Sequence, residues 1–196
     1  LYVYGTMDHK GGTTESIIIS SVEDAINDDV DIISISMGDF DHRSSSFSED
    51  IDKYNIYCEL VNNAVKSGIL FVTSAGNFGG LDADTGREST ISLPGACKDA
   101  LTVGMAFHDY ENLGRSYAPL IPGASSRGPV EYPDSETGET VSYFKPDIVA
   151  PGFEICSTMS KYDSSDKGCS FFYESYYGDH NYVEKKGTSM ATPYVS

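Results

Sequence analysis

The sequence is poor in positive charge and has no long apolar run. It has 13 Lys and Arg against 30 Asp and Glu, which gives a formal net charge of −17. Nucleic acids and anionic membrane surfaces are bound by clustered positive charge, so neither is an expected partner. Because no stretch of about eighteen apolar residues is present, no membrane-spanning helix is expected either.

The composition is that of a folded protein. Among 196 residues, 39% are hydrophobic and 12% are aromatic, which is enough for one sizeable core in a single domain. Leu1–Tyr4 has the pattern of a buried strand, and Ala191–Ser196 has that of the first turns of a helix. We therefore expect residues 1–196 to be a partial domain, truncated at both ends.

The sequence leaves the state of the four cysteines open. Cys58, Cys97, Cys156 and Cys169 permit three fully paired arrangements, and nothing in their spacing selects one of them. The spacing matches no zinc-binding pattern. One or two disulfides would suit an acidic secreted domain, and buried or free thiols are the alternative.

In the first half of the chain, short apolar strands alternate with amphipathic helices. Strands are predicted at residues 1–4, 30–36 and 69–73, and helices at residues 13–29 and 57–65, with Gly68 as the C-cap of the second helix. Such alternation predicts right-handed crossovers and a parallel sheet.

The second half has less helix. Short strands are predicted at residues 100–104 and 147–150, between glycines and prolines. Residues 131–142 and 157–186 are polar and rich in Tyr, Ser and Asp, so we expect long surface loops there. No internal repeat or linker divides the chain into two domains.

The strongest chemical signal is Gly187-Thr-Ser-Met-Ala-Thr-Pro193. A serine hydroxyl is a weak nucleophile unless it is held beside a base. The glycine before Ser189 allows a sharp approach of the chain, and the small Ala191 lets a helix begin and pack closely behind it. At a helix start, Ser189 would have the positive helix end and its own N–H directed toward a developing oxyanion.

A second signal is Ser74-Ala-Gly-Asn-Phe-Gly79, directly after the predicted strand at residues 69–73. The carboxyl ends of parallel strands are where α/β proteins place their sites. The Asn77 side-chain amide there can donate a hydrogen bond to a tetrahedral intermediate.

Taken in order, these segments resemble the motifs of one family. ISISMG at residues 33–38, SAGN at 74–77, SSRGP at 125–129, KPDIVAPG at 145–152 and GTSMATP at 187–193 are similar to successive motifs of subtilisin-like serine proteases. The resemblance implies an α/β, three-layer subtilisin-like fold, with a mostly parallel central sheet flanked by helices. It also implies a serine endopeptidase that acts through an acyl-enzyme.

The resemblance further implies a role for each matching residue. Ser189 would be the nucleophile and Asn77 the oxyanion donor. Pro151 and Gly152 would support the end of the sheet near the nucleophile. A peptide substrate would pair as a strand with Ser36, Met37 and Gly38, and its side chain would enter a pocket walled by Ala75 and Gly76.

The chain departs from the family pattern in the other two triad members. The family order is Asp, His, Ser, with the His in H-G-T-x-V-A-G. Asp84-Thr85-Gly86 follows Asn77 and no buried strand, and none of the histidines, His9, His42, His108 and His180, has that context. We expect the catalytic Asp and His upstream of Leu1, and we expect the 196-residue piece alone to be inactive and poorly stable.

No cofactor is expected for the chemistry, and a structural calcium or another cation remains open. Asp147, with backbone carbonyls around Gly95 and Cys97, resembles a weak cation site of the family, and oxygen ligands suit hard cations. The alternative is that Asp147 is a hydrogen-bonded residue at the edge of the core. The expected partners are peptide or protein substrates, the expected state is a monomer, and secretion is the expected localisation.

Two alternatives were weighed against the protease. An α/β-hydrolase requires Asp and His after its serine, but only seven residues follow Ser189. The second alternative is a catalytically inactive subtilisin-like domain that binds peptides or serves as a scaffold. Retention of both Ser189 and Asn77 favours the active enzyme, since a binding module needs neither.

Overall fold

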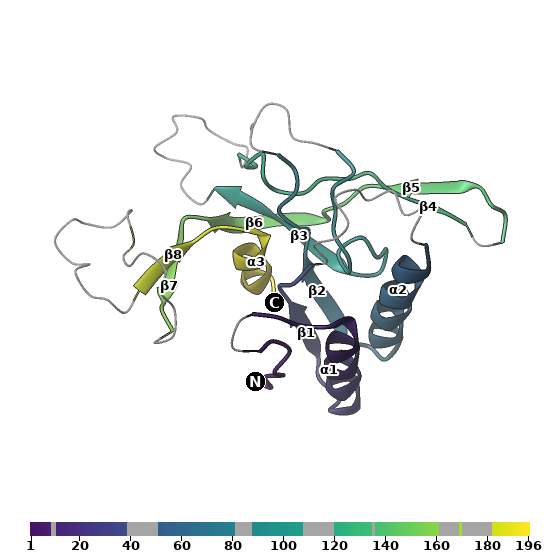
Figure 1. Ribbon diagram of the computed structural model, residues 1–196, viewed down its shortest axis with the longest axis horizontal. Helices are drawn as coiled ribbons and strands as arrows, with labels where there is room; N and C mark the ends of the chain where they lie inside the picture. The colour runs from purple at the N-terminus through teal and green to yellow at the C-terminus, as the bar shows by residue number, and fades with distance from the viewer. Residues whose placement is uncertain are drawn as a thin grey trace.

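The computed structural model describes residues 1–8, 11–38, 51–80, 88–107, 120–134, 136–160, 169 and 182–196, and Figure 1 shows their arrangement. Its centre is a four-stranded sheet of β1 (Ile32–Ile35), β2 (Leu70–Ser74), β3 (Leu101–Phe107) and β6 (Ile148–Phe153). The strands are all parallel and lie in the order β1-β2-β3-β6. The parallel sheet that the alternating pattern predicted is therefore confirmed.

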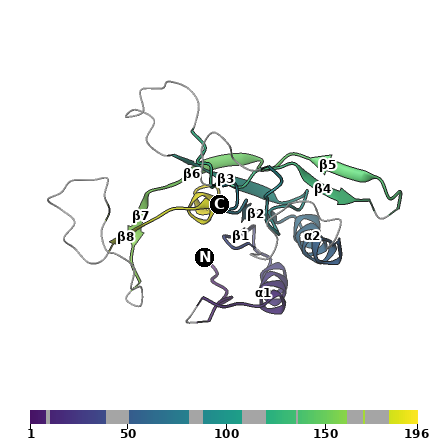
Figure 2. The ribbon, with the colours of Figure 1, turned by 45° about the horizontal axis from the view of Figure 1, so that its top comes forward.

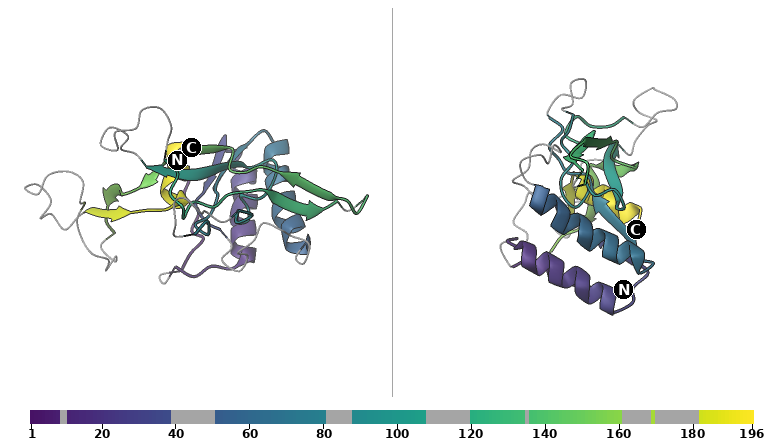
Figure 3. Two further views of the ribbon diagram at one scale, coloured as in Figure 1. Left: turned by 90° about the horizontal axis from the view of Figure 1, so that it is seen from above. Right: turned by 90° about the vertical axis from the view of Figure 1, so that its right-hand side faces the viewer.

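Helices cover both faces of this sheet. On one side lie α1 (Glu15–Asn27) and α2 (Ile51–Lys66), which Figure 3 shows side by side. On the other side lies α3 (Thr188–Ala191), followed by the 3₁₀ turn η1 (Thr192–Tyr194). Helices, sheet and helix form three layers, as the family resemblance implied. None of the described helices is long and apolar enough to cross a membrane.

Helices α1 and α2 follow their apolar periodicity. Val22 and Ala25 of α1 are buried toward the sheet, and Ile18 and Ile26 pack partly buried beside them. Thr14 stands at the N-cap position of α1 but makes no side-chain capping bond. After α2, Gly68 adopts a φ of +89°, a left-handed conformation that glycine takes at little cost, and this ends the helix where predicted.

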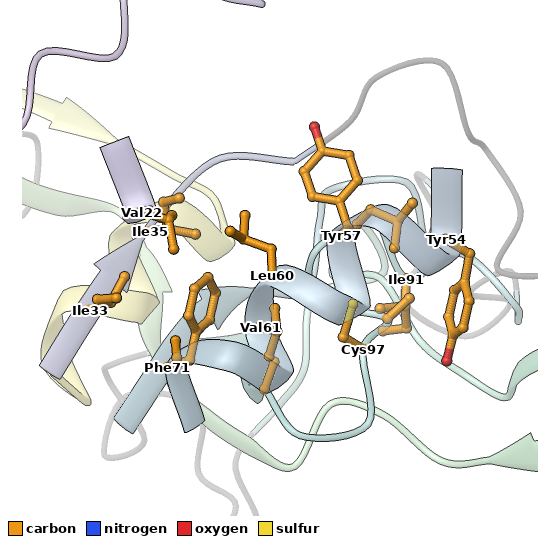
Figure 4. Close-up of a cluster of buried hydrophobic side chains, with 14 of the residues drawn as sticks. Val22, Ile33, Ile35, Tyr54, Tyr57, Leu60, Val61, Phe71, Ile91 and Cys97 are labelled. Atoms are coloured by element: carbon orange, nitrogen blue, oxygen red, sulfur yellow. The ribbon is translucent and has the colours of Figure 1, made fainter. Parts of the chain in front are cut away.

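The larger core lies between these two helices and the sheet. Figure 4 shows Leu60 and Val61 of α2 near Phe71 of β2, and Val22 of α1 beside Ile35 of β1. Phe71 and Val61 are 1% and 0% exposed. Because neighbouring residues of a strand point to opposite faces, Val72 lies on the other side of the sheet from Phe71. There it forms a smaller cluster with Val103, Ala150 and Ala191.

Two antiparallel hairpins extend from the sheet on opposite sides (Figure 2). One pairs β4 (Val130–Pro133) with β5 (Thr140–Tyr143), and the other pairs β7 (Ile155–Thr158) with β8 (Tyr182–Lys185). The prediction of a loop throughout residues 131–142 was therefore wrong. Tyr132 and Tyr143 of this hairpin pack against the core beside Tyr54 of α2, and this packing anchors an otherwise polar segment. Of residues 157–186, the two ends are strand, and most of the remainder lies outside the described residues.

All four cysteines are paired. Cys58 of α2 is joined to Cys97, and Cys156 of β7 is joined to Cys169. The first bridge links α2 to the turn that precedes β3, and its sequence separation is 39 residues. The structure thus selects one of the three arrangements that the sequence had left open.

Leu1–Tyr4 is not a strand, and that prediction was wrong. The segment is largely exposed, and Tyr4 is held by a hydrogen bond from its hydroxyl to Asp28 Oδ2 at 2.7 Å. A groove of about 770 Å³ lies between residues 1–7, α1 and β1. A strand forms only where a neighbouring strand pairs with its backbone, and no described strand pairs with Leu1–Tyr4.

Candidate active site

The predicted functional segments meet at the carboxyl ends of β1 and β2. Ser36–Gly38 follow β1 directly, and Ala75–Asn77 follow β2. The start of α3 comes to the same place from the far end of the chain. Its Ser189 donates a hydrogen bond from Oγ to the Ser36 carbonyl oxygen at 2.9 Å. Residues 153 positions apart in sequence are thus in direct contact.

Two glycines set the position of α3 against β6. The Gly187 N–H donates to the Gly152 carbonyl at 2.8 Å. A Cβ on Gly152 would lie 2.8 Å from the Gly187 carbonyl oxygen and 3.0 Å from Ala191 Cβ, closer than packed atoms approach. Gly187 itself has a φ of +148°, a conformation that other residues rarely adopt. Only glycines at these positions allow the chain to approach β6 and then turn into α3.

The Asn77 side chain is oriented by the residue before the serine. Its Oδ1 accepts the Thr188 N–H at 2.9 Å and the Thr188 hydroxyl at 3.3 Å. The Thr188 hydroxyl oxygen in turn accepts the Gly76 N–H at 3.1 Å. Because a backbone N–H needs an acceptor, Oδ1 must face Thr188, and Nδ2 is turned the other way. Within the described part of the chain, Nδ2 donates to no acceptor, and the Asn77 side chain is exposed.

Ser189 adds a second donor to this place. Its backbone N–H lies in the first turn of α3 and has no acceptor among the described residues. Because α3 begins at Thr188, the positive end of the helix lies at the same place as the Ser189 N–H. Asn77 Nδ2 and the Ser189 N–H are therefore two donors near Thr188 that have no acceptor in the described ranges.

The segments after β1 and β2 are separated by buried serines. A Cβ on Gly38 would lie 2.5 Å from Ser92 Oγ, and a Cβ on Gly76 would lie 2.7 Å from that oxygen and 2.9 Å from Ser126 Oγ. Ser92 and Ser126 are 0% exposed. Ser92 donates from both its N–H and its hydroxyl to the Ala75 carbonyl, at 3.0 and 3.3 Å. These hydroxyls thus fill the space behind both glycines.

Sequence reasoning assigned no role to these two serines. Ser126 is part of the SSRGP segment, and its hydroxyl accepts the Phe78 N–H at 3.0 Å. That segment could have pointed to a contact near Asn77. Ser92 belongs to no motif quoted from the sequence, and only the close approach to Gly38 and Gly76 reveals it.

Met37 completes the segment after β1. Its carbonyl accepts the Ser74 hydroxyl at 3.4 Å, and its sulfur lies 3.7 Å from Thr6 Oγ1. Ser36, Met37 and Gly38 are each partly buried. The residues predicted to bind a substrate strand therefore lie at the surface between the serine and the N-terminal segment.

Several residues considered from the sequence cannot be compared with this site. His9, His42, His108, His180 and Asp84-Thr85-Gly86 lie outside the described residues. Across the described ranges, no group of three or more His, Cys, Asp or Glu is arranged to hold a metal ion.

The oxygens of the candidate cation site at Asp147 are engaged by the chain itself. The Gly95 carbonyl accepts the Thr102 hydroxyl at 2.7 Å, and the Cys97 carbonyl accepts the Ala100 N–H at 3.2 Å. Asp147 Oδ2 accepts the Thr102 N–H at 2.8 Å and the Lys145 ammonium at 2.6 Å.

Comparisons with known proteins agree with this arrangement. A family model described as "Subtilase family" matches residues 1–196. Serine protease AprX of Bacillus subtilis (strain 168) is 31% identical over 194 residues, which are 95% of this chain and 38% of AprX. Subtilisin of Bacillus pumilus is 28% identical over 196 residues, which are 100% of this chain and 50% of that protein. The chain spans half or less of the length of these two relatives.

Solved structures give the same fold. The chain superposes on sphericase with a TM-score of 0.60 at 22% identity, covering 97% of this chain and 49% of sphericase. It superposes on a lanthipeptide protease with a TM-score of 0.62 at 23% identity, covering 98% of this chain and 52% of that one. At such identities the likeness concerns the arrangement of helices and strands.

Proposed function

The chain belongs to the subtilase family, and on that premise we propose that the protein is a serine endopeptidase with Ser189 as its nucleophile. The observation that carries the proposal is the contact between two distant motifs. Thr188, next to Ser189, donates its N–H to Asn77 Oδ1 and so turns Asn77 Nδ2 away from itself; neither Nδ2 nor the Ser189 N–H has an acceptor among the residues that the structure describes. A scaffold would have no need of a hydroxyl beside two unengaged donors.

The reaction in this proposal is acyl transfer. Ser189 Oγ attacks the carbonyl carbon of a peptide bond while a histidine takes its proton. That proton then goes to the leaving amine, and water hydrolyses the acyl-enzyme by the reverse sequence of transfers. The proposal assigns the histidine and its aspartate to positions before Leu1 in the full-length protein, because the family order places both before the serine.

Asn77 and Ser189 would stabilise the negative charge of the tetrahedral intermediate. An oxyanion is stabilised by donors that are already oriented when the charge develops, because no reorganisation is then required. The amide of Asn77 meets this condition, since Thr188 holds its Oδ1. The Ser189 hydroxyl now donates to the Ser36 carbonyl, so it would exchange this bond for one to the histidine before attack.

Substrates are proposed to be peptides bound in extended form. Ser36–Gly38 extend past the end of β1 beside Ser189, and the proposal assigns the substrate to the edge of this segment. A peptide can add to such an edge through main-chain hydrogen bonds. Its side chain would then enter the pocket that the family resemblance assigns to Ala75 and Gly76, with the buried Ser92 and Ser126 hydroxyls behind Gly76.

Secretion is proposed from the cysteines. Disulfides persist in oxidising compartments and are rare in the cytosol, and the chain has two of them. Family membership does not decide this point, because the relatives include a protein named "Major intracellular serine protease" from Bacillus subtilis (strain 168).

A fluorophosphonate probe tests the proposed nucleophile in the full-length protein, freed of any propeptide. The labelled peptide is mapped in the wild type, in Ser189→Ala and in Ser157→Ala, whose serine is exposed on β7. We expect labelling at Ser189 that is lost in Ser189→Ala and retained in Ser157→Ala. Absence of labelling in the folded wild type would refute the protease and favour a peptide-binding domain without catalysis.

A further inference from the structure

A buried ammonium lies beside Asp147. Lys145 precedes β6, and its side chain is 1% exposed. Its Nζ donates to Asp147 Oδ2 at 2.6 Å, to the Ala100 carbonyl at 2.6 Å and to the Lys98 carbonyl at 3.2 Å. A lysine ammonium has three donors, so these three oxygens satisfy it completely.

This set of oxygens resembles the shell of a bound cation. One carboxylate oxygen and two carbonyl oxygens converge on the single positive charge of the Lys145 ammonium. The two carbonyls lie in the turn between the Cys97 disulfide and β3, close to the residues whose sequence resembles a weak cation site of the family. The remaining candidate oxygens of that site, on Gly95 and Cys97, are already hydrogen-bonded to Thr102 and Ala100.

The residues present therefore do not fit a metal ion at Asp147. A metal there would lie against the Lys145 ammonium, and calcium takes six to eight oxygens, often from several carboxylates. We propose that the Lys145 ammonium is the resident cation of this site and takes the place of a metal ion. The protein then needs no dissolved cation beside Asp147. Removal of the Lys145 side chain leaves Asp147 and the two carbonyls as a binding site for a monovalent cation.

Electrostatics explains why the lysine keeps the site. Burying an ammonium costs free energy unless charge and hydrogen bonds compensate it, and all three oxygens supply that compensation. The lysine is covalently attached two residues from Asp147, so a dissolved cation competes with a group of high effective concentration. A single carboxylate balances one positive charge, which favours a monovalent over a divalent replacement.

The site also supports the cleft. The Lys98 and Ala100 carbonyls end the segment that begins at Ser92, and Ser92 is bonded to Ala75 behind Gly38 and Gly76. If the ammonium is lost, that segment loses two hydrogen bonds to the residue that precedes Pro146 and β6. This consequence for the cleft rests on the proposed function, whereas the cation itself is tested by stability alone.

The experiment measures melting temperatures of the full-length protein in choline chloride, with KCl, NaCl, CaCl₂ or methylammonium chloride added at constant ionic strength. Lys145→Ala opens the shell, and Lys145→Met fills it with an apolar chain of similar length. Lys98→Ala is the matched control, because its exposed side chain carries the same charge while its carbonyl stays in the shell.

We expect Lys145→Ala to melt below the wild type and to be restored saturably by K⁺, Na⁺ or methylammonium. The rise should be roughly 5 to 10 °C at a hundred times the dissociation constant. The wild type, Lys98→Ala and Lys145→Met should show no such rise in melting temperature. The double variant Lys145→Ala/Asp147→Asn should not show the rise either. A Lys145→Ala protein that responds to these cations just as the wild type does would overturn the proposal.

A second measurement does not depend on the variant folding. Crystals of the wild type soaked in rubidium chloride should show no anomalous peak within bonding distance of Asp147 and the Ala100 carbonyl. A rubidium ion at that position, with Lys145 displaced, would overturn the proposal.

Discussion

The two faces of the central sheet differ in how they are held together. On the side of α1 and α2, 18 buried residues form one apolar cluster among the described residues. On the side of α3, the corresponding cluster has four residues, of which two are alanine. There, glycine contacts and hydrogen bonds to Gly152, Asn77 and Ser36 position the helix. Among the described residues, apolar packing is thus concentrated on one face, and Ser189 lies on the other.

The largest expected effect is on the stabilising face. Phe71→Ala removes a side chain that is 1% exposed and should destabilise the protein by about 3–5 kcal/mol, because it loses burial and leaves a cavity. Val72→Ala, on the next residue but the opposite face, should cost about 2 kcal/mol. Chemical denaturation of the full-length protein measures both. Val61→Ala, in the larger cluster, is the size-matched partner of Val72→Ala, since both side chains are 0% exposed. A greater loss from Val72→Ala than from Val61→Ala would contradict the difference between the faces.

The two disulfides allow a second comparison, between the core beside α2 and the β7–β8 hairpin. Cys58–Cys97 joins α2 to the core over 39 residues, whereas Cys156–Cys169 closes 13 residues in the outlying hairpin. Loop-closure entropy predicts that replacing the first pair with serines costs about 4 kcal/mol and replacing the second about 3 kcal/mol. Unfolding midpoints of the two double variants test this order. A greater loss from the hairpin bridge would show that the core does not depend on Cys58–Cys97.

Asn77 should affect rate and leave stability nearly unchanged. Asn77→Asp keeps an acceptor for the Thr188 N–H but loses the Nδ2 donor, and kcat/KM should fall roughly 100- to 1000-fold. That magnitude is the one known for the oxyanion asparagine of subtilisin and is carried over. Melting curves recorded beside the kinetics separate the two effects. A large fall in melting temperature with an unchanged rate would make Asn77 a structural residue.

The smallest effect concerns the tyrosines that join α2 to the β4–β5 hairpin. Burial is the main cause that raises the pKa of Tyr54 to about 12, and burial also raises the pKa of Tyr143, whose hydroxyl is 2.9 Å from that of Tyr54. A raised pKa in the folded state adds stability that is complete below pH 10 and is lost as the pH rises from 10 to about 12.

Tyr54→Phe should therefore flatten the alkaline loss of stability. Between pH 8 and pH 10.5, the free energy of unfolding of Tyr54→Phe should fall by about 1 kcal/mol less than that of the wild type. Thermal melts at both pH values, with Tyr182→Phe on the exposed face of β8 as control, measure the difference. Parallel pH profiles for Tyr54→Phe and the wild type would contradict it.

The helices and strands that can be recognised from the apolar pattern of their own residues were predicted from the sequence. α1 and α2 have clear apolar periods, the four parallel strands are short and largely apolar, and the start of α3 has a motif of its own. Leu1–Tyr4 is equally apolar, but a strand depends on a neighbouring strand as well as on its own side chains. The β4–β5 hairpin was missed for the converse reason, since its polar residues are held by Tyr132 and Tyr143 against a distant helix.

The site shows the same limit. Ser189 and Asn77 could be singled out because each stands in a motif after a recognisable element, and the structure brings these motifs together. Ser92 contacts a residue 17 positions away, and Lys145 is bound by two backbone carbonyls 47 and 45 positions away. Carbonyl positions leave no mark on the residue types that carry them, so neither contact could be predicted from the sequence.

The most direct test of the account is a double-mutant cycle of Ser189→Ala and Asn77→Asp in the full-length protein, with peptide hydrolysis as readout. If both residues act on one transition state, Ser189→Ala should lower kcat/KM by several powers of ten, and Asn77→Asp should add little in that background. Retention of hydrolysis in Ser189→Ala, or losses that simply multiply in the double variant, would contradict the claim that these two motifs form one active site.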